Sequence, residues 1–393
     1  MACIIHLLTD SRYCQVAKLH LPHLQHTLKE SGDCENLKIL SDTAKVDLIL
    51  SLVEASRFSD VKWKRHAIAL AKKALQQVND SYLHACVAQR DCVISRISGD
   101  TDRSALALSS FAIEYYPHKI DPRMNAELGQ LTLQSAINHI HNEELVKAIE
   151  ELQSWQPLNA TSPSTAERIA LYHMDLWQGK VFRYQGQFSN SLACLQRALP
   201  ETKHEGSLED ARPRLICELG DVYCELGDPL HAEHLLEAEI KRLDDRGRKN
   251  FTDWRLLQLS HAESLWEQGR LEEAEALCSG IQSSPHLSKL DKLRLSTLFG
   301  RIYHARCDWS NARHYWTKAL SDVSAYPLVN GHTSRVILCS MKEVLLQEDN
   351  LEWSTKYKDQ IKEMKVIKSG GCEYWIPGLG KWYHYLTRPS ERL

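Results

Sequence analysis

The stretch ELGDVYCELGD, residues 218–228, contains the tetrapeptide Glu-Leu-Gly-Asp twice. The doubling could mark a miniature repeat, a turn or a binding site. Comparison with the rest of the chain decides between these possibilities, because other segments carry a similar arrangement of small, aromatic and turn residues.

Four segments share this arrangement at one spacing. Each has a small residue where one helix must touch another: Gly179, Gly220, Ala262 and Gly300. Three residues later stands an aromatic residue or leucine: Phe182, Tyr223, Leu265 or Tyr303. Seven residues after the small residue stands a turn position: Gly186, Gly227, Gly269 or Cys307. Two residues beyond it, an apolar residue or proline opens the next helix: Phe188, Pro229, Leu271 or Trp309.

Helix energetics explain the two glycines of the opening stretch. A glycine inside a helix costs about 1 kcal/mol relative to alanine, so Gly220 needs a packing reason, and close helix approach supplies one. Gly227 can adopt the positive φ of a helix C-cap. Apolar residues with helical spacing follow such turns, as in Trp309, Ala312, Trp316, Ala319 and Leu320. The doubled tetrapeptide is therefore two fixed points of one larger repeat.

These segments resemble tetratricopeptide repeats, which are antiparallel helix pairs joined by a tight turn. The resemblance implies an all-α fold, a right-handed superhelical solenoid. The small residues at positions 179, 220, 262 and 300 are 41, 42 and 38 residues apart, longer than the usual ~34. The additional residues are expected in longer helices or in the links between pairs.

Weaker units extend the array to about eight pairs. Upstream pairs are predicted to turn near Ser59-Asp60, Gly99-Asp100 and Asn142, and residues 333–365 continue the rhythm downstream. The stretch QPLNATSPST is rich in residues that punctuate loops. The predicted divisions are an N-terminal helical cap (1–40), degenerate pairs (41–155), a link (156–165), repeats (166–365) and an aromatic C-terminal cap or tail (366–393).

The C-terminal part of the chain is crowded with aromatic side chains: Tyr374, Trp375, Trp382, Tyr383 and Tyr385. Exposed end faces of a solenoid must be covered, so one interpretation is an aromatic cap on the last helix pair. The other is a tail that folds back over the concave groove, as a lid or as a mimic of a ligand.

Composition excludes several classes. The net charge is −3 with 25% charged residues, which argues against nucleic-acid binding, although a tRNA ligand stays open. No apolar run is long enough to span a membrane, and the N-terminus is a poor signal peptide. The 12 cysteines include no Cys-x-x-Cys pair and suggest buried thiols in a reducing cytosol. We expect a cytoplasmic protein without cofactor or bound metal, and the sequence does not indicate its oligomeric state.

One cluster of candidate site residues comes from the resemblance. First helices of tetratricopeptide pairs line the concave groove, which implies that Asp221, Glu225, Glu263 and Glu267 face it. Stacked helices lie roughly 9–10 Å apart, so the four carboxylates would gather on one wall. Basic and aromatic residues are predicted on the same face: Lys180, Arg183, Tyr184, Trp266, Arg294, Arg301 and His304.

Three interpretations of these acids stay open. They could form a solvated wall paired with its basic neighbours, a site for a cationic ligand (a basic peptide or a guanidinium-containing small molecule), or a divalent-metal site. Like charges four residues apart slightly destabilise a helix, so helix stability does not explain them. We expect Asp221 and Glu263 to be exposed, so that lysine in their place would barely affect folding.

The leading functional hypothesis is a non-catalytic scaffold or adaptor that binds a partner's cationic peptide in the groove. The chain has no glycine-rich phosphate loop and no recognisable hydrolase or kinase motif, and no catalytic residue is assigned. The alternative is an enzyme whose acidic groove orients an arginine-like or aminoacyl substrate, possibly carried by tRNA, for group transfer.

Overall fold

A computed structural model describes the chain over residues 40–114, 119–204, 208–248, 252–283, 287–324, 331–363 and 376–387, together with Pro22 and His26. Within these ranges the regular elements are helices, with no strand. The all-α prediction is therefore confirmed. The predicted N-terminal cap lies outside the described residues except for Pro22, His26 and Leu40.

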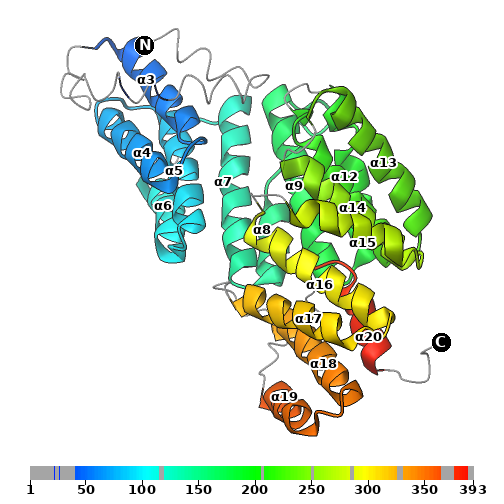
Figure 1. The fold of residues 1–393 in the computed structure, drawn as a ribbon. Helices are drawn as coiled ribbons and strands as arrows, with labels where there is room; N and C mark the ends of the chain where they lie inside the picture. The colour runs from blue at the N-terminus through cyan, green and yellow to red at the C-terminus, as the bar shows by residue number, and fades with distance from the viewer. Residues whose placement is uncertain are drawn as a thin grey trace. The chain divides into compact units, whose positions relative to one another are not determined.

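The described helices form the predicted eight antiparallel pairs (Figure 1). The first four are α3 (Asp42–Ala55) with α4 (Val61–Leu75), α5 (Ser81–Ile97) with α6 (Thr101–Glu114), α7 (Pro122–His141) with α8 (Leu145–Ser154), and α9 (Thr165–Tyr184) with α10 (Phe188–Ala198). The others are α12 (Arg212–Glu225) with α13 (Pro229–Asp245), α14 (Thr252–Glu267) with α15 (Leu271–Gln282), α16 (Lys289–Ala305) with α17 (Trp309–Ser324), and α18 (Gly331–Gln347) with α19 (Leu351–Glu363). The short α11 (Glu201–His204) and the C-terminal α20 (Leu379–Thr387) complete the set.

Contacts divide the chain into two compact units. Unit 1 comprises Met1–His141 and Lys147–Met174, and unit 2 comprises Asn142–Val146 and Asp175–Leu393. The cluster of predicted site residues lies entirely in unit 2. None of the described helices is both long and apolar enough to cross a membrane.

The small residues of the repeat lie where helices touch. An added Cβ on Gly220 of α12 would lie 2.8 Å from Cδ1 of Leu236 on α13. The equivalent Cβ on Gly300 of α16 would lie 2.8 Å from the indole of Trp316 on α17. Both distances are far below van der Waals contact, so each pair closes only because its first helix lacks a side chain there. The predicted packing role of these residues is confirmed.

The predicted turn positions have the expected backbone. Gly227 has a φ of +84°, and Cys307, which replaces glycine at the same place, has a φ of +57°. In both turns the chain leaves the first helix through a left-handed residue. After Gly227, Asp228 accepts a hydrogen bond from the backbone N–H of His231 at 3.2 Å and so caps α13.

Replacement of Gly220 by Leu should therefore destabilise unit 2 by roughly 1–3 kcal/mol or more, because the new side chain enters the space of Leu236. Thermal unfolding measures the effect. Gly280→Leu on α15 is the matched control, since nothing lies within 4 Å of a Cβ there. A Gly220→Leu protein with the stability of the wild type would contradict the packing role.

In unit 1 the loop between α8 and α9 is ordered around one carboxylate. Glu167, only 1% exposed, accepts hydrogen bonds from Nδ2 of Asn125 at 2.8 Å and from the backbone N–H of Leu158 at 2.8 Å. Its other oxygen accepts from the backbone N–H and the Oγ of Ser164, at 3.0 and 2.8 Å. Ser164 and Glu167 thereby cap the start of α9.

Candidate functional site

The candidate site is built on the first helices of successive pairs in unit 2. Helix α12 contacts α14, and α14 contacts α16, so their inward-facing side chains form one continuous surface. We define the inner face by the predicted residues of these helices: Asp221, Glu225, Glu263, Trp266, Glu267, Arg294, Arg301 and His304. The structure brings these residues together.

Two of the predicted acids belong to buried ion pairs. Asp221 and Glu263 are 2% and 0% exposed. Nη2 of Arg294 lies 2.6 Å from Oδ1 of Asp221, and Arg301 donates to both oxygens of Glu263, at 2.7 and 2.5 Å. The expectation that both acids are exposed is wrong, because α16 supplies an arginine to each of them below the surface.

Burial and ion pairing shift the pKa values of the carboxyl groups on the inner face in opposite directions. Burial raises the pKa of Asp221, although Arg294 works against the shift. Burial also raises the pKa values of Glu225 and Glu267, against the hydrogen bonds that these two acids accept. The charged forms of Asp221, Glu225 and Glu267 are therefore favoured only by the cations and donors that they contact.

A second charged group lies between α9 and α12. Oε1 of Glu218 lies 2.9 Å from Nζ of Lys180, and Oε2 lies 3.1 Å from Nε of Arg183. Despite the burial of Glu218, these two cations hold the pKa of its carboxyl well below the usual range. The Arg183 guanidinium also lies over the ring of Tyr184, 4.9 Å from its centroid. The three predicted residues of α9 therefore form their own cluster around Glu218.

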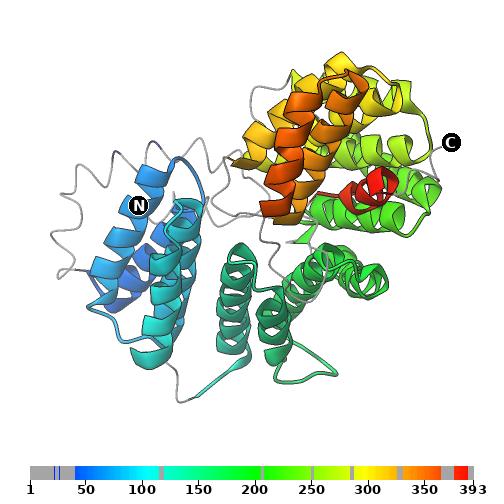
Figure 2. The same cartoon turned by 90° about the horizontal axis from the view of Figure 1, so that it is seen from below.

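The chain's own C-terminal segment, residues 376–387, lies on the inner face; its helix α20 is the red helix of unit 2 in Figures 1 and 2. The backbone N–H of Gly378 donates to Oε1 of Glu225 at 2.7 Å. Nζ of Lys381 lies 2.9 Å from Oε2 of Glu267 and also donates to the carbonyl oxygen of Cys224. The two acids without an arginine partner on α16 therefore receive their donors from this segment.

Trp382 anchors the C-terminal segment among aromatic side chains. It is 2% exposed, and its Nε1 donates to Oγ of Ser340 on α18 at 2.9 Å. Its ring stacks with Trp316 at a centroid distance of 6.1 Å and meets Trp266 and His304 edge-on, at 6.1 and 5.0 Å. The segment thus contacts the last described pair through α18 as well as the acids of α12 and α14.

Gly378 fits the inner face because it has no side chain. Its φ is +75°, and an added Cβ would overlap Oε1 of Glu263 and Nη1 of Arg301. These two atoms belong to an ion pair whose side chains are both 0% exposed. A side chain at position 378 would therefore have to displace a buried ion pair that is held by two hydrogen bonds.

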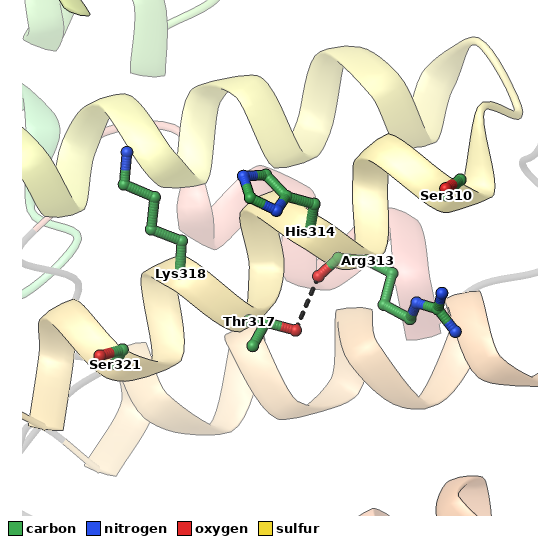
Figure 3. A pocket seen from close by; sticks show the side chains of 6 residues that line it. All are labelled: Ser310, Arg313, His314, Thr317, Lys318 and Ser321. Atoms are coloured by element: carbon green, nitrogen blue, oxygen red, sulfur yellow. Dashed lines mark hydrogen bonds between the residues drawn. The ribbon is translucent and has the colours of Figure 1, made fainter.

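A pocket lies along an exposed face of α17 (Figure 3). It has a volume of about 580 Å³ and is lined by Ser310, Arg313, His314, Thr317, Lys318 and Ser321. All six residues come from this one helix, and Thr317 hydrogen-bonds back to the carbonyl of Arg313 at 2.8 Å. A single helix cannot surround a ligand, so this surface is a poor candidate site.

Among the residues that the structure describes, one group of side chains could hold a metal ion: Glu233, Glu237 and His261, whose ligand atoms lie within 4.8 Å of one another on α13 and α14. Burial lowers the pKa of His261, which favours the neutral imidazole that a metal needs. However, Glu233 already accepts from Nη1 of Arg270 at 2.6 Å and from Gln268 at 2.8 Å. The guanidinium opposes a second cation at this place.

No family model matches the chain, and no curated protein matches it. Solved structures do. A Rap protein complexed with Competence and Sporulation Factor aligns with a TM-score of 0.50 and 11% identity, over 77% of this chain and 79% of that chain. This chain has a tetratricopeptide-like helical-repeat fold.

Two further structures align less closely with this tetratricopeptide-like fold. A tetratricopeptide repeat protein from Parabacteroides merdae has a TM-score of 0.48 and 16% identity, with 76% of this chain and 99% of that chain covered. PilW, a widely conserved type IV pilus biogenesis factor, has a TM-score of 0.41 and 14% identity, with 60% and 92% covered.

Sequence reasoning missed several residues of the site in this tetratricopeptide-like fold. Glu218 was not predicted, although it precedes Asp221 by three residues and therefore lies on the same side of α12. Gly378 and Lys381 were not assigned either, and Trp382 was named only as one of several aromatic residues. The acids that Gly378 and Lys381 bind are more than a hundred residues away in the chain, and Ser340, which Trp382 binds, is 42 residues away; repeat spacing carries no signal for such contacts.

Proposed function

We propose that the protein is a non-catalytic interaction protein whose inner face binds a partner segment that carries a basic residue. The observation that carries the proposal is the position of Lys381. Its ammonium group reaches Oε2 of Glu267 on α14, at 2.9 Å, and the carbonyl oxygen of Cys224 on α12. Two neighbouring helices thus offer acceptors to one lysine.

The four acids have different partners, and this difference supports a polypeptide ligand. Arg294 and Arg301 neutralise the inner acids, so Glu225 and Glu267 are the ones that receive donors from outside the repeats. Glu225 accepts a backbone N–H, a group that any polypeptide carries and a small guanidinium compound does not. A peptide supplies both kinds of donor from one chain.

The fold is compatible with this proposal and does not establish it. Stacked helix pairs present extended concave surfaces that recognise peptides and helices. The similar Rap protein was crystallised in complex with Competence and Sporulation Factor. At 11% identity that similarity concerns the fold alone, so the proposal rests on the contacts of Lys381.

The enzymatic alternative loses part of its basis. Group transfer on an arginine-like or aminoacyl substrate depended on four acids collected on one open wall. Two of these acids are occupied by buried arginines, with side chains at most 8% exposed in either pair. The interaction hypothesis therefore explains more of the contacts on the inner face than the enzymatic alternative does.

Affinity capture from native extract with the full chain as bait tests the proposal. The wild type should retain a defined protein partner, and Glu267→Lys should lose it, because a cationic segment then meets a like charge. The control Glu352→Lys makes the same change at an exposed position of α19 and should retain the partner. Retention should weaken as ionic strength rises.

Two results would reject the proposal. One is equal recovery of the partner by wild type and Glu267→Lys. The other is chemical alteration of extract metabolites or charged tRNA with no protein bound, which would favour the enzymatic alternative.

A further inference from the structure

We infer that the C-terminal segment is a built-in competitor for the partner. We also infer that the partner segment has the same chemistry: a glycine, a lysine three positions later and an aromatic residue next to it. This inference rests on the proposed function and adds to it the class of partner and the means by which access is controlled.

The glycine requirement comes from the fixed part of the inner face. The Glu263–Arg301 pair directly below Gly378 is fully buried, and a Cβ at Gly378 would overlap both side chains. A partner segment that approaches Glu225 with its backbone N–H meets the same obstacle. Glycine is the residue that meets this requirement and the positive φ together.

The lysine requirement comes from the acids that the segment satisfies. If the segment leaves, Glu225 loses the N–H of Gly378 and Glu267 loses the ammonium of Lys381. A replacement that brings the same two donors restores both contacts and is therefore preferred. The Lys381 side chain is 34% exposed, so its charge pair adds little to the attachment of the segment.

The aromatic requirement comes from the site of Trp382. Its indole is enclosed by Trp266, His304 and Trp316 and donates to Ser340. A desolvated pocket that holds one tryptophan is typical of the central contact of a protein interface. A partner must fill this pocket with a side chain of similar size and shape.

The segment is short, and tertiary packing holds it in place: Ile376, Leu379 and Trp382 are at most 2% exposed and belong to the apolar core around α17 and α18. Helix α20 has nine residues, fewer than the ~12–15 that an isolated helix needs to be even marginally stable. Its attachment to the same chain nevertheless gives it an effective concentration on the order of millimolar. A free peptide therefore competes poorly with the intact segment and well with a weakened one.

Binding of a labelled synthetic peptide of residues 376–387 to the full-length chain tests the inference. Gly378→Ala should expel the segment, because the new Cβ overlaps the Glu263–Arg301 pair. We expect this variant to bind the peptide at least about tenfold more tightly than the wild type does. The matched control is Gly280→Ala, whose added Cβ meets nothing within 4 Å. A peptide with Glu in place of Lys381 should not bind.

A second variant, Lys381→Glu, removes the ion pair between the segment and Glu267 at a partly exposed side chain. It tests the inference if Gly378→Ala does not fold. Its control is Lys358→Glu on the exposed face of α19. In both segment variants, amide hydrogen exchange of residues 376–387 should accelerate while α12 and α14 stay protected.

The outcomes separate the two proposals. Equal binding of the peptide to wild type and variants would overturn the competitor role and leave the proposed function standing. Faster exchange of residues 376–387 without peptide binding to any chain would overturn both. A third outcome is that the melting temperature falls and that amide exchange rises in the segment and in α12 and α14 together. The segment would then be a structural cap, which also overturns the competitor role.

Discussion

Replacement of Arg301 by Met should lower the free energy of unfolding of unit 2 by about 3–5 kcal/mol. Arg301 and Glu263 are each 0% exposed and bind through two hydrogen bonds. Removal of the guanidinium alone leaves the carboxylate buried without its counter-charge, which is the costly case. Burial of a charge is tolerated only when it is paired.

The double variant Glu263→Leu with Arg301→Met should recover most of the lost stability, because apolar side chains of similar volume replace a buried pair at little cost. Denaturant unfolding of the three chains measures both effects. Arg313→Met is the matched control, since that side chain is 48% exposed and pairs with Glu348 at the surface. Equal stability of Arg301→Met and wild type would show that the pair contributes nothing to the fold.

The repeats could be predicted because local backbone and packing geometry requires glycine at fixed positions. Gly220 must be small for α12 to approach α13, and Gly227 must leave the helix with positive φ. Both constraints act between residues near in sequence, so they recur in each pair at fixed spacing. Cys307 shows the limit of the pattern, since the left-handed position persists there without glycine.

The opening stretch also shows why the site was only partly predictable. Its two tetrapeptides have different tasks: Glu218 and Asp221 bind cations of α9 and α16, while Glu225 binds the C-terminal segment and Asp228 caps α13. The periodicity places acids on one face of α12. It does not specify which acid becomes buried, because that depends on arginines two pairs away.

Replacement of Glu167 by Gln should lower the stability of unit 1 by about 3 kcal/mol or more at pH 7. The carboxylate accepts four hydrogen bonds, from Asn125, Leu158 and the backbone and side chain of Ser164. The glutamine side chain presents an NH₂ group to donors and leaves some of them unsatisfied. Hydrogen exchange of peptides covering residues 122–141 and 147–174 locates the effect in unit 1, and Glu150→Gln at an exposed position of α8 is the control.

The same carboxylate predicts an acid dependence with a definite sign. Burial opposes ionisation of Glu167, but the hydrogen bonds from Leu158, Asn125 and Ser164 outweigh it and lower its pKa from 4.5 to about 2. A carboxyl with a depressed folded-state pKa stabilises the fold fully above pH 4.5, and that contribution disappears as the pH falls toward 2. Unit 1 of the wild type should therefore lose stability across this interval, and Glu167→Gln should lose less. Parallel curves for the two chains would show that the loop around α9 does not depend on the charge of Glu167.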